Sequence, residues 1–286
     1  MSSGDHDLFK SSTGLARMSK DRSKLNLILV ELGSLPFSLK PVVARLNRVQ
    51  NYLRFGVGDP VPQIGDPDLD SYEYSFSKLS GLASLRRREQ EDYVVGITSV
   101  PLEGDWFSTS LARSIVITTH DADRFMAEAG LPVEKYVELE IVSNLLASEY
   151  YLAGGQEHGL WHPSPMGCIF DFAGIKRDII RKVREAKIER VCQSKMDIAN
   201  VAKSLVQACQ SILNQVRKTS LTDSAKIALK DPIAGFLLGG VIVSVFLEII
   251  DQAYPLARLY SAVALAVVLI VFVLSIYYRQ NRGSKQ

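Results

Sequence analysis

Two apolar segments near the C-terminus constrain this chain more than any other feature. They run from Ile233 to Ile250 and from Leu259 to Tyr278, and Glu248 is the one charged residue within them. As helices they would be roughly 27 to 30 Å long, about the thickness of the hydrocarbon layer of a bilayer. A helix of this length in water carries a polar stripe, and neither segment has one. We therefore expect a two-span hairpin in a lipid bilayer, in preference to a hydrophobic hairpin buried in a soluble fold.

The charges beside the two segments predict the orientation of the hairpin. The loop between the segments, 251–258, contains one acid and one base. Basic residues instead flank the outer ends of the pair: Arg217, Lys218, Lys226, Lys230, Arg279, Arg282 and Lys285. Since positive charge concentrates on the cytoplasmic side, both termini are expected in the cytoplasm, as in an integral protein of the inner or plasma membrane.

Small residues line one face of the first segment. They are Gly235, Gly239, Gly240 and Ser244. Small side chains let helix backbones approach closely in lipid, where packing drives association. This face serves either to pack the two spans together or to join copies in a homo-oligomer. Glu248 either reaches the headgroups or lines a polar path when hairpins cluster.

Composition limits the classes of partner and of chemistry. The chain has 286 residues and a formal net charge of +2, which does not indicate nucleic-acid binding. Its three cysteines are Cys168, Cys192 and Cys209. In a reducing cytoplasm they are expected as thiols or metal ligands and not as disulfides. Residues 1–24, rich in small and charged residues, are expected to be disordered.

Residues 25–174 show the alternation of strands and helices that is typical of one cytosolic domain. Strands are predicted at Leu25–Leu32, Tyr93–Val100 and Ser114–Thr119 from short apolar runs bounded by turn residues. Helices are predicted at Pro41–Phe55 and Pro132–Leu152 from apolar spacings of three and four. We expect an α+β fold, with helices around a small mixed sheet.

Residues 175–230 are predicted to form a helical stalk between this domain and the hairpin. No glycine or proline interrupts Ile175–Val216, and an apolar seam runs along its later part: Ile198, Ala202, Leu205, Cys209, Ile212 and Val216. Such a seam either packs on the domain or pairs with a copy of itself. The sequence leaves both arrangements open.

Acidic residues on the predicted helices and strand ends are candidates for acid–base chemistry. Glu134, Glu138 and Glu149 lie on the segment 132–152, and His120 stands beside Asp121 at a strand end. A general acid–base pair can be drawn from either group. Charged helix faces and strand-end aspartates are mostly structural, so we expect no catalytic residue among them.

The one concentrated group of metal-ligand residue types is His158, His162, Cys168 and Cys192. Imidazole and thiolate are the natural donors for zinc, and four of them complete a tetrahedral site. Cys192 lacks a second cysteine two or three residues away, so no zinc knuckle forms. We therefore expect no bound cofactor, and zinc is the one candidate if this group does bind a metal.

The same region resembles the archaemetzincin family of zinc peptidases, whose motif is H-E-x-x-H-x-x-G-x-x-H-C-x4-C-x-M, followed by C-x-x-C. With His162 on the third histidine, Gly159 matches the glycine and Cys168 matches the second cysteine. Cys192 lies within a residue or two of the final cysteine, and Val94–Leu102 resembles a strand of the family. The resemblance covers about Leu25 to Cys192 and implies a zincin-like fold.

Departures from that motif imply a fold without peptidase chemistry. Leu152–Gln156 replaces H-E-x-x-H, which removes two zinc ligands and the carboxylate that would deprotonate the attacking water. Phe170 replaces the methionine, and Pro163 replaces the first cysteine. The resemblance thus implies a pseudo-metallopeptidase.

Three functions are compatible with this layout. The favoured one is a membrane-anchored, non-enzymatic sensor–effector, whose cytosolic domain binds a ligand or protein and controls oligomerisation of a membrane-perturbing hairpin. The arrangement resembles the membrane effectors of bacterial antiphage defence. The first alternative is a membrane-tethered zinc hydrolase that uses His158, His162, Cys168 and Cys192. The second is a passive scaffold that holds a partner at the inner membrane.

Overall fold

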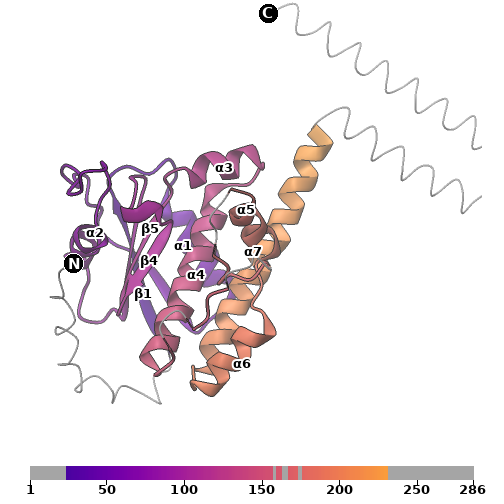
Figure 1. The fold of residues 1–286 in the computed structure, drawn as a ribbon. Coiled ribbons are helices and arrows are strands. Elements are labelled where there is room, and N and C mark those ends of the chain that lie inside the picture. The colour runs from indigo at the N-terminus through magenta and orange to yellow at the C-terminus, as the bar shows by residue number, and fades with distance from the viewer. Residues whose placement is uncertain (1–23, 157–158, 163–166, 173–175, 231–286) are drawn as a thin grey trace, which may run out of the picture. The chain divides into compact units, whose positions relative to one another are not determined.

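The computed structural model describes residues 24–156, 159–162, 167–172 and 176–230 (Figure 1). The predicted hairpin, with its small-residue face at Gly235, Gly239, Gly240 and Ser244 and its acid Glu248, lies outside them, as does the N-terminal segment before residue 24. Within the described residues, none of the helices combines the length and apolarity needed to span a membrane. The chain divides into two compact units, Met1–Ser224 and Ala225–Gln286, and the fold described here is that of the first.

A five-stranded mixed sheet forms the centre of this unit. Its strand order is β2-β1-β3-β5-β4, and β4 alone runs antiparallel to its neighbour. The strands are β1 (Leu25–Leu32), β2 (Leu53–Val57), β3 (Tyr93–Thr98), β4 (Ser108–Leu111) and β5 (Ser114–Thr118). Every residue of β3 is buried, as expected for a parallel strand that is covered on both faces. The three predicted strands and the mixed sheet are confirmed.

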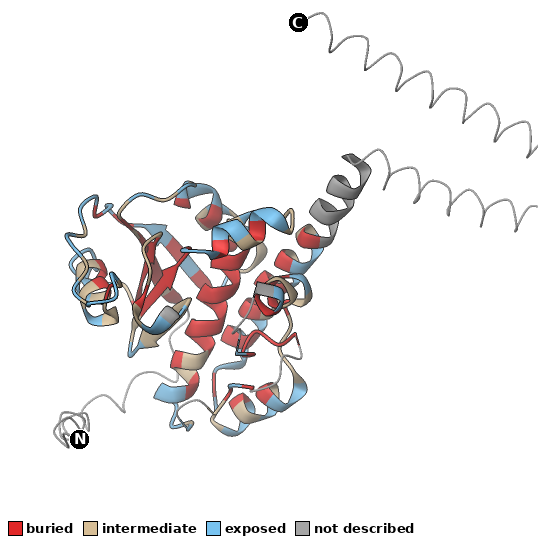
Figure 2. Cartoon of the chain, turned by 45° about the horizontal axis from the view of Figure 1, so that its top comes forward, coloured by how far each residue is buried: buried red, intermediate tan, exposed pale blue. Residues whose placement is uncertain are grey.

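Helices cover both faces of the sheet and create two apolar cores. Their bounds are α1 (Leu39–Val49), α2 (Phe76–Ser84), α3 (Ala122–Glu128), α4 (Val133–Leu152), α5 (Lys176–Glu185), α6 (Arg190–Ile198) and α7 (Lys203–Lys230), with a 3-10 turn η1 (Glu103–Asp105). The smaller core packs α2 against Ile28, Val30 and Val116. The larger core lies on the opposite face and joins the sheet to α4 and α7 (Figure 2).

Helix α4 is the central helix of the unit and confirms the predicted helix at 132–152. It lies between the sheet and α5, and buried residues occur all around its circumference (Figures 1 and 2). Gly154, with φ of 88°, follows its end and adopts a left-handed conformation that favours glycine. Two acids on α4, Glu138 and Glu140, are buried, and Glu138 accepts a bond of 2.6 Å from Arg45 Nε on α1.

The predicted helix over Pro41–Phe55 is partly wrong, because the structure ends α1 at Val49 and begins β2 at Leu53. Asn47 explains the change: its side chain bonds both the N–H and the carbonyl oxygen of Phe55, each at 2.9 Å. These bonds fold the strand back along the helix. Leu53 and Phe55 are then buried on one side of β2, beside β1.

The described part of the predicted stalk, residues 176–230, is helical but consists of three helices, α5, α6 and α7. The breaks contain Ala186 and Asn200, whose φ values are 39° and 61°. Neither is a glycine or proline, so the sequence carries no signal for the breaks. The apolar seam of α7, including Leu205, Cys209 and Val216, is buried in the larger core. The seam therefore packs on its own domain.

Candidate functional site

A large cleft opens between the edge strand β4 and helix α4. Its volume is about 1350 Å³, and every residue from Ser108 to Ala112 lines it. The opposite wall is one face of α4: Tyr136, Glu140, Ser143, Asn144, Ala147, Ser148, Tyr150 and Tyr151. Two short segments, Gly159–Trp161 and Ile169–Phe172, and the α5 residues Ile179 and Lys182 complete the wall.

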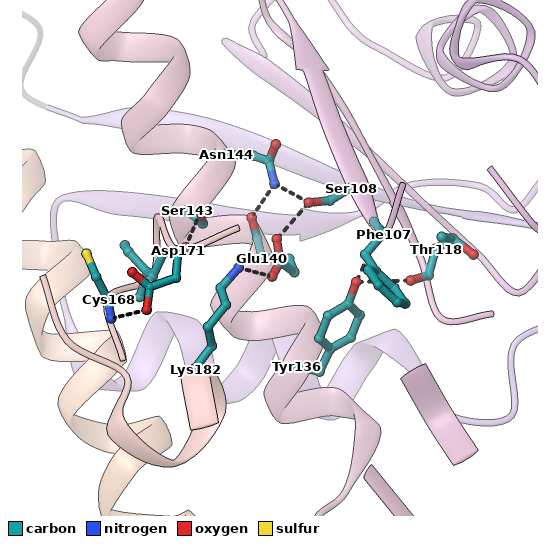
Figure 3. Close-up of polar contacts among 11 residues, drawn as sticks. Phe107, Ser108, Thr118, Tyr136, Glu140, Ser143, Asn144, Cys168, Asp171 and Lys182 are labelled. Atoms are coloured by element: carbon teal, nitrogen blue, oxygen red, sulfur yellow. Dashed lines mark hydrogen bonds and ion pairs between the residues drawn. The ribbon is translucent and has the colours of Figure 1, made fainter. Parts of the chain in front are cut away.

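A buried ion pair lies where α4, α5 and β4 meet in this cleft (Figure 3). Lys182 Nζ donates to Glu140 Oε1 at 3.0 Å, and the two side chains are 9% and 7% exposed. Ser108 Oγ donates to Glu140 Oε2 at 2.6 Å. Asn144 Nδ2 donates to Ser108 Oγ at 2.9 Å. Both carboxylate oxygens are therefore engaged, so Glu140 holds the walls together and is poorly placed to act as a general base.

Other hydroxyl groups that line the cleft differ in whether they have a hydrogen-bond partner within the protein. The Tyr136 hydroxyl reaches the carbonyl oxygens of Phe107 and Thr118, at 3.1 and 3.2 Å (Figure 3), and burial raises the pKa of this tyrosine well above its usual value. Ser143 Oγ donates to the carbonyl oxygen of Ile169 at 3.0 Å. By contrast, the buried Ser148 hydroxyl has no hydrogen-bond partner among the described residues. Such a group is a candidate ligand contact.

Three aromatic side chains from separate segments meet in the lining of the cleft and form what we call the aromatic cluster: Trp106, Trp161 and Phe172. The Trp106 ring lies 5.7 Å from that of Trp161 and 5.8 Å from that of Phe172, with edge-to-face geometry. The three residues are 42%, 38% and 49% exposed. Exposed rings that hold one another in place are typical anchors for a bound side chain.

Behind this wall, the structure brings together three of the four candidate metal ligands, which we call the His–Cys–Cys group: His162, Cys168 and Cys192. Their ligand atoms all lie within 4.8 Å of one another, and all three residues are buried. His162 Nε2 is 2.9 Å from Cys192 Sγ, and the two sulfur atoms are 3.9 Å apart. The fourth candidate, His158, lies outside the described residues. None of the three lines the cleft.

Short backbone pairings place these three residues. His162 lies opposite Asp171, with bonds of 3.1 Å from His162 N to Phe170 O and from Phe172 N to His162 O. Cys168 lies opposite Lys187, in the break between α5 and α6. That break lets the first turn of α6 bring Cys192 to the group.

The chemistry of the group suits zinc. A tetrahedral zinc with Zn–S bonds of ~2.3 Å holds two sulfurs about 3.8 Å apart, close to the 3.9 Å found between Cys168 and Cys192. The thiol of Cys192 hydrogen bonds to Cys168 and lowers the pKa of Cys168 to about 6, so its thiolate is available at neutral pH. Burial instead raises the pKa of Cys209, which is not part of the group.

The cleft itself holds no second set of metal ligands among the residues described. The stretch aligned with H-E-x-x-H, Leu152–Gln156, begins at the last residue of α4, so it cannot present two ligands on one helix face. On α4 several pairs of cleft-lining residues lie four apart, from Tyr136 and Glu140 to Ala147 and Tyr151, but none of these pairs combines two usual zinc ligands. His120 is the one histidine among the described lining residues.

Comparison with known proteins found solved structures only. No protein-family model and no curated protein matches the sequence. An archaemetzincin from Methanopyrus kandleri is 16% identical with a TM-score of 0.42, and the match covers 62% of this chain and 96% of that one. A zinc-dependent peptidase from Methanocorpusculum labreanum is 16% identical, with a TM-score of 0.40 and coverages of 59% and 99%. An archaemetzincin from Archaeoglobus fulgidus is 19% identical, with a TM-score of 0.36 and the same coverages.

Two of these structures are archaemetzincins, the family that the sequence motif resembles, and the other is described as a zinc-dependent peptidase. Their similarity to this chain is one of overall arrangement, and the identities are too low to transfer chemistry. The function of the cleft is therefore argued from its own residues.

Proposed function

We propose that the first unit is a non-enzymatic binding domain whose cleft holds an extended segment of a protein partner without cleaving it. One observation carries the proposal: the His–Cys–Cys group lies behind the cleft wall and not in the cleft. A hydrolytic metal must present bound water to the substrate. A metal held by these three buried residues would have no contact with a ligand in the cleft.

An extended peptide fits the cleft better than a small molecule does. Small-molecule pockets usually measure about 300–1,000 Å³, and this cleft exceeds that range. It also runs along β4, which is the edge of the sheet and whose one strand neighbour among the described residues is β5. An unpaired edge recognises an extended segment through backbone hydrogen bonds. The aromatic cluster offers a subsite for one of its side chains.

Zinc in this proposal is structural. His162, Cys168 and Cys192 would hold it, with His158 as the sequence's candidate for a fourth ligand. When bound, zinc would supply a cross-link between the wall and α6, which carries Cys192.

Loss of the Trp161 side chain is expected to weaken peptide binding about tenfold or more, because aromatic anchors dominate such interfaces. The probe is a set of fluorescein-labelled peptides selected from a random-sequence library on the full-length protein, with binding read by anisotropy. Tyr72→Ala is the matched control, because Tyr72 is 81% exposed and does not line the cleft. A library without binders, or equal affinity for Trp161→Ala and wild type, would contradict the proposal.

Backbone chemistry of the selected peptides tests pairing with β4 separately. N-methylation removes an N–H donor and leaves the side chain in place. Alternate residues of a strand point their N–H groups to opposite sides. Methylation of one alternating set should therefore abolish binding, while methylation of the other should leave it intact.

For the full chain, we propose a membrane-anchored sensor–effector in which occupancy of the cleft controls oligomerisation of the two-span hairpin, with antiphage defence as the setting. The support is the sequence: apolar segments of spanning length and a face of small residues. Overexpression in a bacterium should collapse the membrane potential. Gly239→Leu should prevent the collapse, and Tyr72→Ala, which changes an exposed residue outside the cleft, should not. Normal growth and potential would favour the passive scaffold.

A further inference from the structure

We infer that the His–Cys–Cys group and the cleft form one coupled unit, so that zinc binding sets the position of the aromatic cluster and thereby the affinity of the cleft for its peptide. This inference rests on the proposed function and names its regulation. It follows from the way in which metal ligands directly adjoin cleft-lining residues in the same two short segments.

The first segment is Gly159–His162. Trp161 lines the cleft, whereas the next residue, His162, is buried and belongs to the His–Cys–Cys group. Successive residues of an extended backbone point to opposite sides. A metal that fixes the imidazole of His162 thus also fixes the direction of the Trp161 side chain.

In the second segment, Gly167–Phe172, a candidate metal ligand again lies directly beside cleft-lining residues. Cys168 belongs to the His–Cys–Cys group, while the residues from Ile169 to Phe172 line the cleft. Asp171 Oδ2 accepts bonds from the backbone N–H groups of Gly167 and Cys168, at 2.6 and 3.0 Å, which makes a tight turn around the thiol. The ring of Phe172 lies 6.5 Å from that of Trp161, so the two segments meet on the cleft side as well.

Core packing and several hydrogen bonds already hold these segments to the rest of the domain: Leu160, Ile169 and Phe170 are buried in the larger core. Ser143 on α4 binds the carbonyl oxygen of Ile169. On the opposite side, Lys195 Nζ donates to the carbonyl oxygen of Gly159 at 2.5 Å, and Cys192 Sγ donates to that of Leu160 at 3.5 Å. A metal would add firm bonds from His162 and Cys168 to Cys192 on α6. It would therefore stiffen the wall that carries Trp161 and Phe172.

Thermodynamic linkage gives this arrangement a measurable consequence. If zinc stabilises the arrangement of the wall that accepts the peptide, zinc must raise peptide affinity, and peptide must raise zinc affinity by the same factor. Coupling of this kind typically changes affinity 5- to 150-fold, as an order of magnitude. A structural metal outside the wall would leave peptide affinity unchanged.

The two tryptophans of the chain provide the test, because both belong to the aromatic cluster. Full-length protein in detergent is stripped with a chelator and titrated with zinc chloride, while tryptophan emission and bound zinc are measured together. We expect one zinc per chain and a shift of the emission maximum that saturates at the same ratio. Cys192→Ser should abolish the shift, and Cys209→Ser should preserve it, since Cys209 is a buried thiol outside the group.

The labelled peptides are then titrated into zinc-loaded and zinc-free protein. Affinity that rises about tenfold or more with zinc supports the inference. Stoichiometric zinc with unchanged emission and unchanged affinity overturns it, as does the absence of zinc binding. If neither the zinc-loaded nor the zinc-free protein binds a peptide, the proposed function is wrong. The inferred effect of zinc on peptide affinity is then wrong as well. A zinc-dependent emission shift would then still show that the metal positions the cluster.

Discussion

Replacing Lys182 with alanine is expected to lower the free energy of unfolding by about 3–5 kcal/mol, because it leaves the carboxylate of Glu140 buried without its cationic partner. The pair joins α5 to α4, and both side chains are less than 10% exposed. Among the described residues, Ser108 would remain as the one group bonded to the carboxylate. Urea unfolding of the full-length protein in detergent, followed by circular dichroism, measures the loss.

Lys187→Ala is the matched control, because Lys187 also pairs with carboxylates but is partly exposed. Its ammonium lies 3.2 Å from Glu185 and 2.9 Å from Glu189, but the side chain is 38% exposed, so we expect a loss below about 1 kcal/mol. The double variant Glu140→Gln, Lys182→Met should recover most of the stability, because it removes both charges together. Equal losses for Lys182→Ala and Lys187→Ala would show that burial of the Glu140–Lys182 pair has been misjudged.

Cys192→Ser is expected to reduce zinc affinity at least hundredfold, which corresponds to about 2.7 kcal/mol. The substitution removes a thiolate from the centre of the His–Cys–Cys group, where Cys192 contacts both other members. Because a metal that binds only the folded state stabilises it, the variant should also lose the rise in melting temperature that zinc gives to the wild type.

Elemental analysis after dialysis against a weak chelator measures the retained zinc. His158→Ala should weaken binding less than Cys192→Ser if His158 is a fourth ligand, and not at all if water takes that position. Cys209→Ser should retain one zinc per chain. Stoichiometric zinc in Cys192→Ser would place the metal elsewhere and remove the physical basis of the coupled wall.

The sequence predicts well those helices and strands whose conformation follows from a local pattern of apolar residues. The strands β1, β3 and β5 and the helix α4 are apolar or periodic over their whole length, so burial decides their state. Strand β4 reads Ser-Thr-Ser-Leu and is a strand because it pairs with β5, a tertiary cause that no local pattern contains. The break at Ala186 has a tertiary partner too, because the next residue, Lys187, pairs with Cys168.

For the candidate site, the sequence again shows what is local, the residue types, and does not show what depends on tertiary structure. Their residue types identify His162, Cys168 and Cys192 as candidate zinc ligands. Their proximity in space, however, depends on the break between α5 and α6, which the sequence does not indicate. Glu140 and Lys182 are 42 positions apart and were not candidates. One signal is present in the sequence: Glu138 and Glu140 interrupt a segment whose apolar residues surround the helix, so acids at these two positions are expected to be buried with partners.

The central claim is that the cleft binds peptide without cutting it, and mass spectrometry tests this most directly. Zinc-loaded full-length protein is incubated with the random-sequence peptide library, and the molecular masses of the bound and unbound peptides are measured. We predict that bound peptides are recovered at their original masses. New masses that appear with the wild-type protein and disappear with Cys192→Ser would show zinc-dependent hydrolysis and contradict the account.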